Sequence, residues 1–170
     1  MLSSSLSTGI KKLQEEQIQI KKSGILATIQ GTVAPIKKNK KPDFLHWRGN
    51  ICGPKNTPYS NGLYYFEIKF TSEYPYKGPI DVQMRTKTYH PNIDSSNGHI
   101  CDTYFSQWNS ENNVYGIVNA IHELLSNPYP PSSYNSLDEK KASEFNLKYA
   151  TLNQDYNWDD SWNKGWDNSN

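Results

Sequence analysis

The first part of the chain carries apolar residues at helical spacing, with lysines and glutamates between them. Leu6, Ile10, Leu13, Gln17 and Ile20 recur at spacings of four and three, and all but Gln17 are apolar. Gly24 follows this pattern, and glycine is a natural helix stop. The pattern predicts an amphipathic helix that ends near Gly24.

The residues after this helix favour strands. A β-branched stretch from Ile25 to Ile36 predicts the first strand, and a lysine-rich loop follows it. Three further strands are predicted where apolar and polar residues alternate, at 45–51, 66–70 and 80–84. Because short turns separate these segments, we expect a four-stranded antiparallel meander.

Periodicity stops at Thr86 for about thirty residues, a length that is more typical of a functional loop than of a simple connection. Helical spacing returns from Ile117 to Leu125. A capping-box pattern at Ser136 predicts a last helix that starts near Leu137. The fold class is therefore α+β, with an N-terminal helix, a meander, a long loop and C-terminal helices.

Composition and charge are those of one globular domain. The chain has 170 residues, is 21% charged and has a net charge of +1, which excludes a highly charged disordered chain. The charge is uneven: residues 1–50 carry nine basic and three acidic residues, whereas residues 121–170 carry four basic and eight acidic residues. No run of 18 apolar residues occurs, so we expect no membrane span and a cytoplasmic or nuclear protein.

Two cysteines are too few for a disulfide framework or a four-ligand zinc site. Cys101 lies in the long loop, where an exposed thiolate could act as a nucleophile toward a large substrate. Asn92 supplies an amide of the type that stabilises an oxyanion. Taken alone, Cys101 could equally be a buried small residue, and His90 and Asn92 could be turn residues. Cys52 falls in a predicted strand, so we expect it in the core.

The order of these features resembles the ubiquitin-conjugating enzyme family from about Ile10 to Asn157. The resemblance rests on the triplet His90-Pro91-Asn92, on a cysteine and a tryptophan beyond it, and on these further matches: Trp47, Gly53-Pro54, Thr57-Pro58-Tyr59, Gly62, Tyr74-Pro75 and Pro79. It implies the ubiquitin-conjugating fold, with a catalytic domain at residues 1–157 and a Trp-, Asp- and Asn-rich tail at residues 158–170.

The resemblance also implies a function. Cys101 would accept ubiquitin, or a ubiquitin-like protein, as a thioester from an activating enzyme and pass it to a substrate lysine or to a ligase cysteine. Asn92 would stabilise the oxyanion or hold the loop in shape, and His90 and Pro91 would have structural roles. We expect a monomer that needs no metal and no organic cofactor and does not bind nucleic acid.

The spacing around the cysteine departs from the family pattern. Common members have one residue fewer between the triplet and the cysteine, and one more between the cysteine and the tryptophan. Either the loop bulges before Cys101 or the cysteine sits one position along. Asp102 is the only candidate for the acid that follows the cysteine in the family, and Ser132 occupies the place of an acid or serine across the cleft. Both are candidate catalytic residues, although Ser132 could be a turn residue.

Partner docking is implied at three places. Lys11 and Lys12 match basic positions that meet the activating enzyme, and Tyr76 matches the aromatic residue of the first ligase loop. The second ligase loop, commonly Ser-Pro-Ala, is replaced here by Asn109, Ser110 and Glu111.

Other interpretations remain open. A catalytically inactive member of the same fold would bind ubiquitin without transferring it, but such variants usually lack the cysteine. A single-strand nucleic-acid binder would use Trp47 and Tyr64 as stacking platforms. In the tail, Trp158, Trp162 and Trp166 recur at spacings of four and could recruit a partner.

Overall fold

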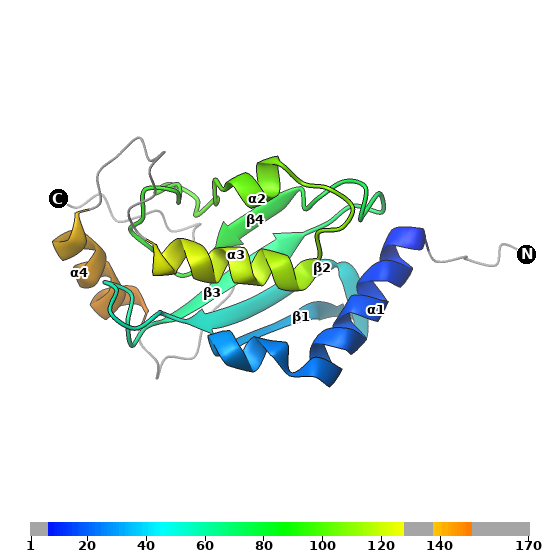
Figure 1. Ribbon diagram of the computed structural model, residues 1–170, viewed down its shortest axis with the longest axis horizontal. Helices are drawn as coiled ribbons and strands as arrows, with labels where there is room; N and C mark the ends of the chain where they lie inside the picture. Colours follow the sequence, from blue (N-terminus) through cyan, green and yellow to red (C-terminus); the bar gives the residue numbers. More distant parts are fainter. Residues whose placement is uncertain (1–6, 128–137, 151–170) are drawn as a thin grey trace, which may run out of the picture.

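The computed structural model describes residues 7–127 and 138–150. Its elements, in chain order, are α1 (Thr8–Ser23), the 3₁₀ helix η1 (Ile25–Ile29), β1 (Gly31–Lys38), β2 (Lys41–Cys52), β3 (Leu63–Lys69), β4 (Asp81–Met84), α2 (Thr103–Ser106), α3 (Val114–Ser126) and α4 (Glu139–Tyr149). Figure 1 shows α3 crossing the sheet, with α1 and α4 at opposite ends of it. Residues 158–170, the predicted tail, lie outside the described residues, as does the predicted domain boundary at Asn157.

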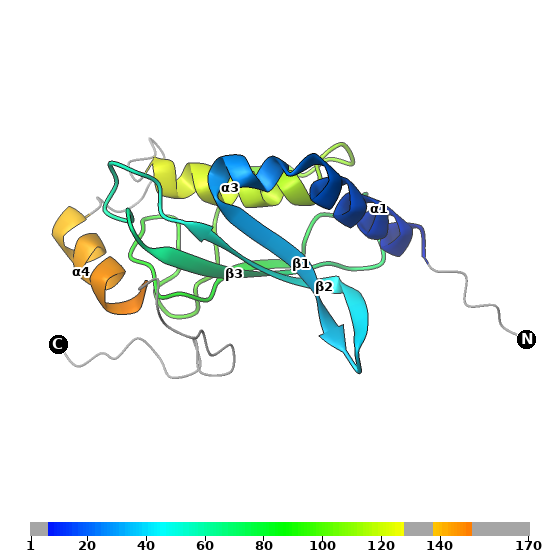
Figure 2. The ribbon, with the colours of Figure 1, turned by 90° about the horizontal axis from the view of Figure 1, so that it is seen from below.

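The four strands form one antiparallel sheet in the order β1-β2-β3-β4, which confirms the predicted meander and the α+β fold. In Figure 2, α1, η1 and α3 lie on one side of this sheet. The alternation in β2 and β3 arises because one face of the sheet packs against these helices.

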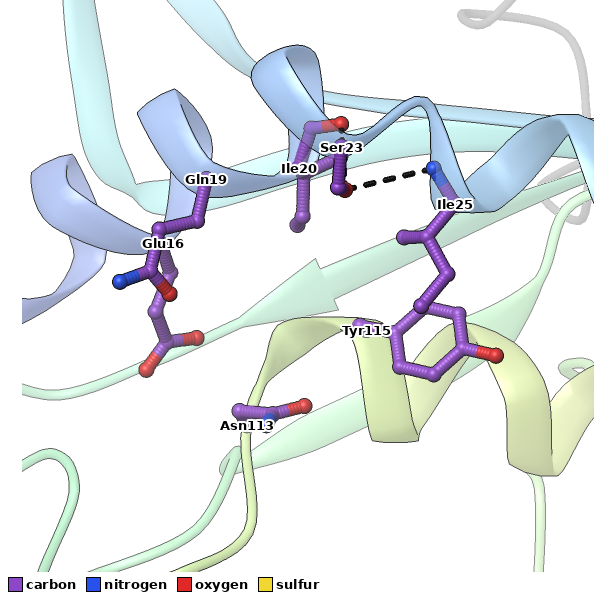
Figure 3. A pocket seen from close by; sticks show the side chains of 7 residues that line it. All are labelled: Glu16, Gln19, Ile20, Ser23, Ile25, Asn113 and Tyr115. Carbon is purple, nitrogen blue, oxygen red and sulfur yellow. Dashed lines mark hydrogen bonds between the residues drawn. The ribbon is translucent and has the colours of Figure 1, made fainter.

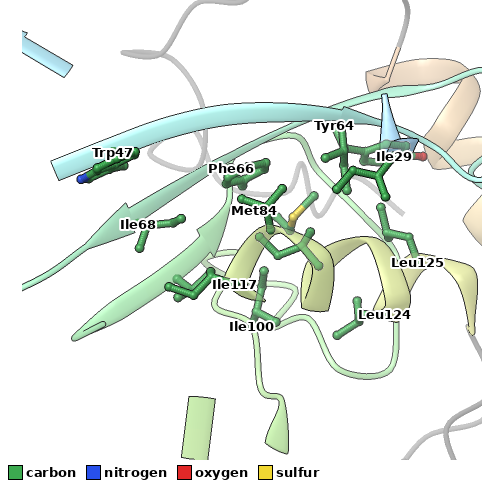
Figure 4. Close-up of a cluster of buried hydrophobic side chains, with 14 of the residues drawn as sticks. Ile29, Trp47, Tyr64, Phe66, Ile68, Met84, Ile100, Ile117, Leu124 and Leu125 are labelled. Carbon is green, nitrogen blue, oxygen red and sulfur yellow. The ribbon is translucent and has the colours of Figure 1, made fainter. Parts of the chain in front are cut away.

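The core lies between the sheet and α3 (Figure 4). Trp47, Phe66 and Met84 from the strands have no exposed surface, and neither do Ile117 and Leu125 from α3. The helix predicted at Ile117–Leu125 is therefore confirmed, with an N-terminus at Val114. Asn113 caps this helix, its side chain accepting a hydrogen bond from the Gly116 N–H.

Two predictions near the start of the chain are wrong in detail. Residues Ile25–Ile29 form a 3₁₀ helix instead of a strand, because Leu26 and Ile29 are both buried and a spacing of three places them on one side of such a helix. The lysine-rich loop is a hairpin turn of only two residues, Asn39 and Lys40, and its flanking lysines belong to β1 and β2.

The last helix begins at Glu139, two residues later than predicted. Asp138 caps it by accepting a hydrogen bond from the Lys141 N–H at 3.1 Å. Ser136, the expected cap, lies outside the described residues. The first helix agrees with its prediction, since it ends where Gly24 adopts a left-handed conformation with φ of 61°.

Candidate active site

Cys101 is exposed and is paired through its backbone with Asn92. The Cys101 N–H donates to the Asn92 carbonyl at 2.9 Å, and the Asn92 side-chain Nδ2 donates to the Cys101 carbonyl at 3.2 Å. The next pair along, Ile93 and Ile100, forms an isolated β-bridge. The structure thus brings together Cys101 and Asn92, the two residues that the sequence singled out, although they are nine positions apart.

A tight turn connects these paired residues. Gly98, with φ of 79°, donates its N–H to the Asp94 carbonyl at 2.8 Å and closes the turn. Ile100 then donates to the Val82 carbonyl of β4 at 3.0 Å, and Met84 of β4 donates to the Gly98 carbonyl at 2.8 Å. Of the two arrangements left open by the spacing, this turn is compatible with a loop that bulges before Cys101, and the choice between them stays a prediction.

His90 is buried and both of its ring nitrogens are hydrogen-bonded. Nδ1 accepts from the Asn92 N–H at 2.9 Å, so Nε2 carries the proton and donates to the Leu124 carbonyl of α3 at 2.8 Å. Burial lowers the pKa of His90 to about 4, which keeps the ring neutral. His90 therefore ties the loop to α3 and has no nitrogen left to act as a base toward Cys101. The neighbouring Pro91 is half-buried.

The amide of Asn92 is only partly satisfied. Its nitrogen faces the Cys101 carbonyl, which can only accept, and one of the two amide hydrogens remains unused by that bond. Its oxygen Oδ1 is buried and has no hydrogen-bond partner among residues 7–127 and 138–150. A buried unpaired acceptor is unusual in a folded protein and is more frequent at functional sites.

Asp102 has a structural contact of its own. Its Oδ1 accepts a hydrogen bond from the Tyr104 N–H at 2.7 Å, and its carbonyl accepts from the Phe105 and Ser106 N–H groups at the start of α2. This one-turn helix was not expected from the sequence. Ser132, the other candidate for this role, lies outside the described residues.

The candidate docking residues are exposed, except for the half-buried Lys12. The Tyr76 side chain is 78% exposed, Lys11 is exposed and Lys12 is half-buried. Asn109, Ser110 and Glu111 are all exposed. Trp108 joins the two loops, because its Nε1 donates to the Pro75 carbonyl at 2.8 Å and its ring packs beside Tyr74.

A buried carboxylate that the sequence reading missed connects these elements. Glu16 of α1 accepts hydrogen bonds from the Tyr74 hydroxyl, at 2.7 and 2.9 Å, and from the Val114 N–H at the start of α3, at 2.8 Å. Burial raises the pKa of Glu16, although these bonds oppose the rise. Figure 3 shows Glu16 beside Asn113 in a pocket of about 220 Å³ between α1 and α3. The available signal was its spacing of three from Leu13, which places both on the buried face of α1.

Several other residues are not part of this site. Cys52 is half-buried at the end of β2 and not in the core as expected. Trp47 and Tyr64 are buried, so neither can stack a nucleic-acid base, and that interpretation is wrong. Trp158, Trp162 and Trp166 lie outside the described residues.

In the described part of the chain, no cluster of three or more His, Cys, Asp or Glu residues has an arrangement that could hold a metal ion. None of its helices is long and apolar enough to span a membrane.

Comparison with known proteins gives a consistent result. The family model for ubiquitin-conjugating enzymes matches residues 13–156. A Plasmodium yoelii protein assigned as a ubiquitin-conjugating enzyme has a similar structure, with a TM-score of 0.71, 29% identity, and coverage of 85% of this chain and 97% of that one. The E2 domain of a Toxoplasma gondii ubiquitin-conjugating enzyme is similar in fold, with a TM-score of 0.66, 24% identity, and coverage of 81% and 99%.

Proposed function

Because the chain belongs to the ubiquitin-conjugating enzyme family, we propose that Cys101 carries ubiquitin, or a ubiquitin-like protein, as a thioester. The activating enzyme would supply the acyl group, and a substrate lysine or a ligase cysteine would receive it. The observation that carries this proposal is the exposed thiol of Cys101 on a backbone that is bonded to Asn92 in both directions.

The first step is an exchange of thioesters. The Cys101 thiolate attacks the carbonyl held by the activating enzyme, an S–C bond forms at Cys101, and the cysteine of the activating enzyme leaves as a thiolate. An exposed thiol suits this step because the donor is a protein, which cannot reach a buried sulfur. No imidazole assistance comes from His90, since both of its ring nitrogens are engaged.

In the second step an amine attacks the carbonyl on Cys101. The C–N bond forms, the C–S bond breaks, the Cys101 thiolate leaves and the amine loses a proton. Negative charge develops on the carbonyl oxygen, and the unused amide hydrogen of Asn92 lies next to Cys101, where it could donate to that oxygen. We propose that Asp102 faces the incoming amine with the carboxylate oxygen that does not cap α2.

Incubation with activating enzyme, ATP and ubiquitin tests the proposal. We expect an adduct that thiol reductant cleaves in the wild type, a reductant-resistant oxyester in Cys101→Ser, and no adduct in Cys101→Ala. Cys52→Ala is the matched control, because it removes the other thiol and should charge like the wild type. An adduct that persists in Cys101→Ala would contradict the assignment.

The alternative is an inactive member of the fold that binds ubiquitin without catalysis. It predicts that ubiquitin binds but that no covalent adduct appears in any of these proteins. Intact mass and a binding titration on the same samples separate the two functions.

A further inference from the structure

The tip of the β1–β2 hairpin projects from the sheet (Figure 2). The pairing explains why: Pro35 pairs with Trp47, but the next residue, Ile36, pairs with Asp43, so residues 44–46 of β2 have no partner in β1. A bulge of this kind bends a strand and increases its twist. The tip beyond it therefore leaves the plane of the main sheet.

This tip concentrates positive charge. Lys37, Lys38, Lys40 and Lys41 are all exposed and lie within five positions of the chain. Of these four lysines, only Lys38 has a carboxylate partner among the described residues, Asp43 at 2.9 Å. Three of the four charges at the tip thus have no carboxylate partner among residues 7–127 and 138–150.

Two features of the tip lower the stability of the hairpin. Lys38 lies directly opposite Lys41 in the strand register, and like charges placed opposite each other are destabilising. Lys40 has φ of 65° at the second turn position, where glycine is preferred because a Cβ makes that conformation unfavourable. Because these residues destabilise the hairpin, a role in binding accounts for them better than a role in folding.

We propose that this tip, residues 37–41, binds a run of aspartate and glutamate carboxylates in an acidic segment of a protein partner. Such a segment would neutralise the three unpaired lysines and relieve the repulsion between Lys38 and Lys41. Protection of an edge strand explains lysines on β1. It also covers Lys41, because β3 pairs with β2 only from His46 onward. It does not explain Lys40, which lies in the turn.

The tip suits a short acidic peptide better than other polyanions. It holds neither arginine nor an aromatic residue, the side chains that stack on single-stranded nucleic acid. It also presents no large exposed apolar side chain for a lipid surface, since those in the described part of the chain are Ile18, Tyr76, Ile80 and Leu147.

This inference goes beyond the proposed function, because binding at the tip involves neither Cys101 nor its loop. The test measures fluorescence anisotropy of a labelled decapeptide of alternating Asp and Glu against the full chain, without activating enzyme or ATP. The variant is Lys40→Gln with Lys41→Gln. The matched control is Lys21→Gln with Lys22→Gln, which removes the same charge from exposed positions at the end of α1.

We expect the tip variant to bind the peptide about tenfold more weakly than the wild type, since each exposed ion pair contributes a few-fold in affinity. The control should stay within about twofold. Loss of folding would not mimic this result, because removing Lys41 relieves a repulsion, and the Tm of the tip variant should equal or exceed that of the wild type.

Three outcomes would overturn the proposal. The first is no measurable binding of the peptide at low salt, and the second is an equal loss of affinity in the tip variant and the control. The third is that a single-stranded oligonucleotide, or vesicles of phosphatidylserine, bind to the same lysines more tightly than the peptide does. Charging of Cys101 is independent of all three, so a failure here is distinguishable from a failure of the proposed function.

Discussion

The two sides of Cys101 are held by different kinds of contact. On the upstream side the backbone is paired: Cys101 with Asn92, and Ile100 with Val82 of β4. On the downstream side local and side-chain contacts dominate, namely the Asp102 cap of α2 and the Trp108 bond to the Pro75 carbonyl. The position of the cysteine is therefore set by backbone pairing before it.

This difference would allow the chain to accommodate the two departures from the family spacing that the sequence indicates. A backbone pair does not depend on side-chain identity, so a residue added within the turn that ends at Gly98 leaves the pairing of Cys101 intact. On the downstream side, the one-turn helix α2 can shorten the path from Cys101 to Trp108 without moving the cysteine. The comparison predicts that changes upstream are more damaging than changes downstream.

The largest effect should come from moving the thiol by one position. In Cys101→Ala with Asp102→Cys, the thiol leaves the residue paired with Asn92 and enters the cap of α2. We expect no ubiquitin adduct from this variant in the charging assay. Charging at the wild-type rate would show that the upstream pairing does not set the position of the nucleophile.

The Asn92→Ala substitution should have the second-largest effect. Removing one oxyanion donor slows acyl transfer by about 100 to 1,000-fold, or roughly 2.7–4 kcal/mol. We expect the variant to accept ubiquitin normally but to discharge it to free lysine that much more slowly in a single-turnover assay. If charging is impaired as severely as discharge, Asn92 acts mainly by holding the loop in shape.

His90 makes the upstream side sensitive to acid. Its pKa is about 4 in the folded chain and about 6.5 when unfolded, so between these values the unfolded state binds a proton that the folded state does not. Stability should therefore fall by about 2 kcal/mol between pH 7 and pH 5 because of this group.

Urea unfolding of the wild type and of His90→Gln at both pH values measures this contribution. Glu16 has the opposite sign, since its raised pKa favours the folded state as pH falls, but it is present in both proteins and cancels in the difference. A pH dependence that is equal in the two proteins would contradict the account of a neutral, buried His90.

The smallest effect is expected from a substitution on the downstream side of Cys101. Asp102→Asn keeps a good N-cap for α2 and removes only the charge. Because an exposed ion pair contributes at most about 1 kcal/mol, we expect discharge to lysine to slow by about fivefold, and by more than in Ser132→Ala. If Ser132→Ala is the slower variant across pH, the two roles are reversed.

The sequence predicted best what depends on local pattern. Alternation identified β2, β3 and β4 because one side of the sheet is buried, and helical spacing identified α1 and α3. The alternation pattern failed for Ile80. This residue alternates with Val82, yet it is 64% exposed and lies just before β4 begins. It also failed for Leu26 and Ile29, whose β-branched surroundings favour a strand although their burial requires a 3₁₀ helix.

The residues of the candidate site could be proposed from the sequence, but their contacts could not. Cys101, Asn92 and His90 were identified from their spacing and from the family resemblance. The bond from Tyr74 to Glu16 joins residues 58 positions apart, and the bond from Val114 to Glu16 joins residues 98 positions apart. No local pattern carries such information, because these contacts exist only once the helices have packed.

The central claim is that Cys101 is the acceptor of the acyl group, and intact mass spectrometry after incubation with activating enzyme, ATP and ubiquitin tests it most directly. We predict a single added mass, that of one ubiquitin less one water. It should disappear on addition of thiol reductant and be absent from Cys101→Ala. An unchanged mass in the wild type, or an added mass that survives in Cys101→Ala, would contradict the claim.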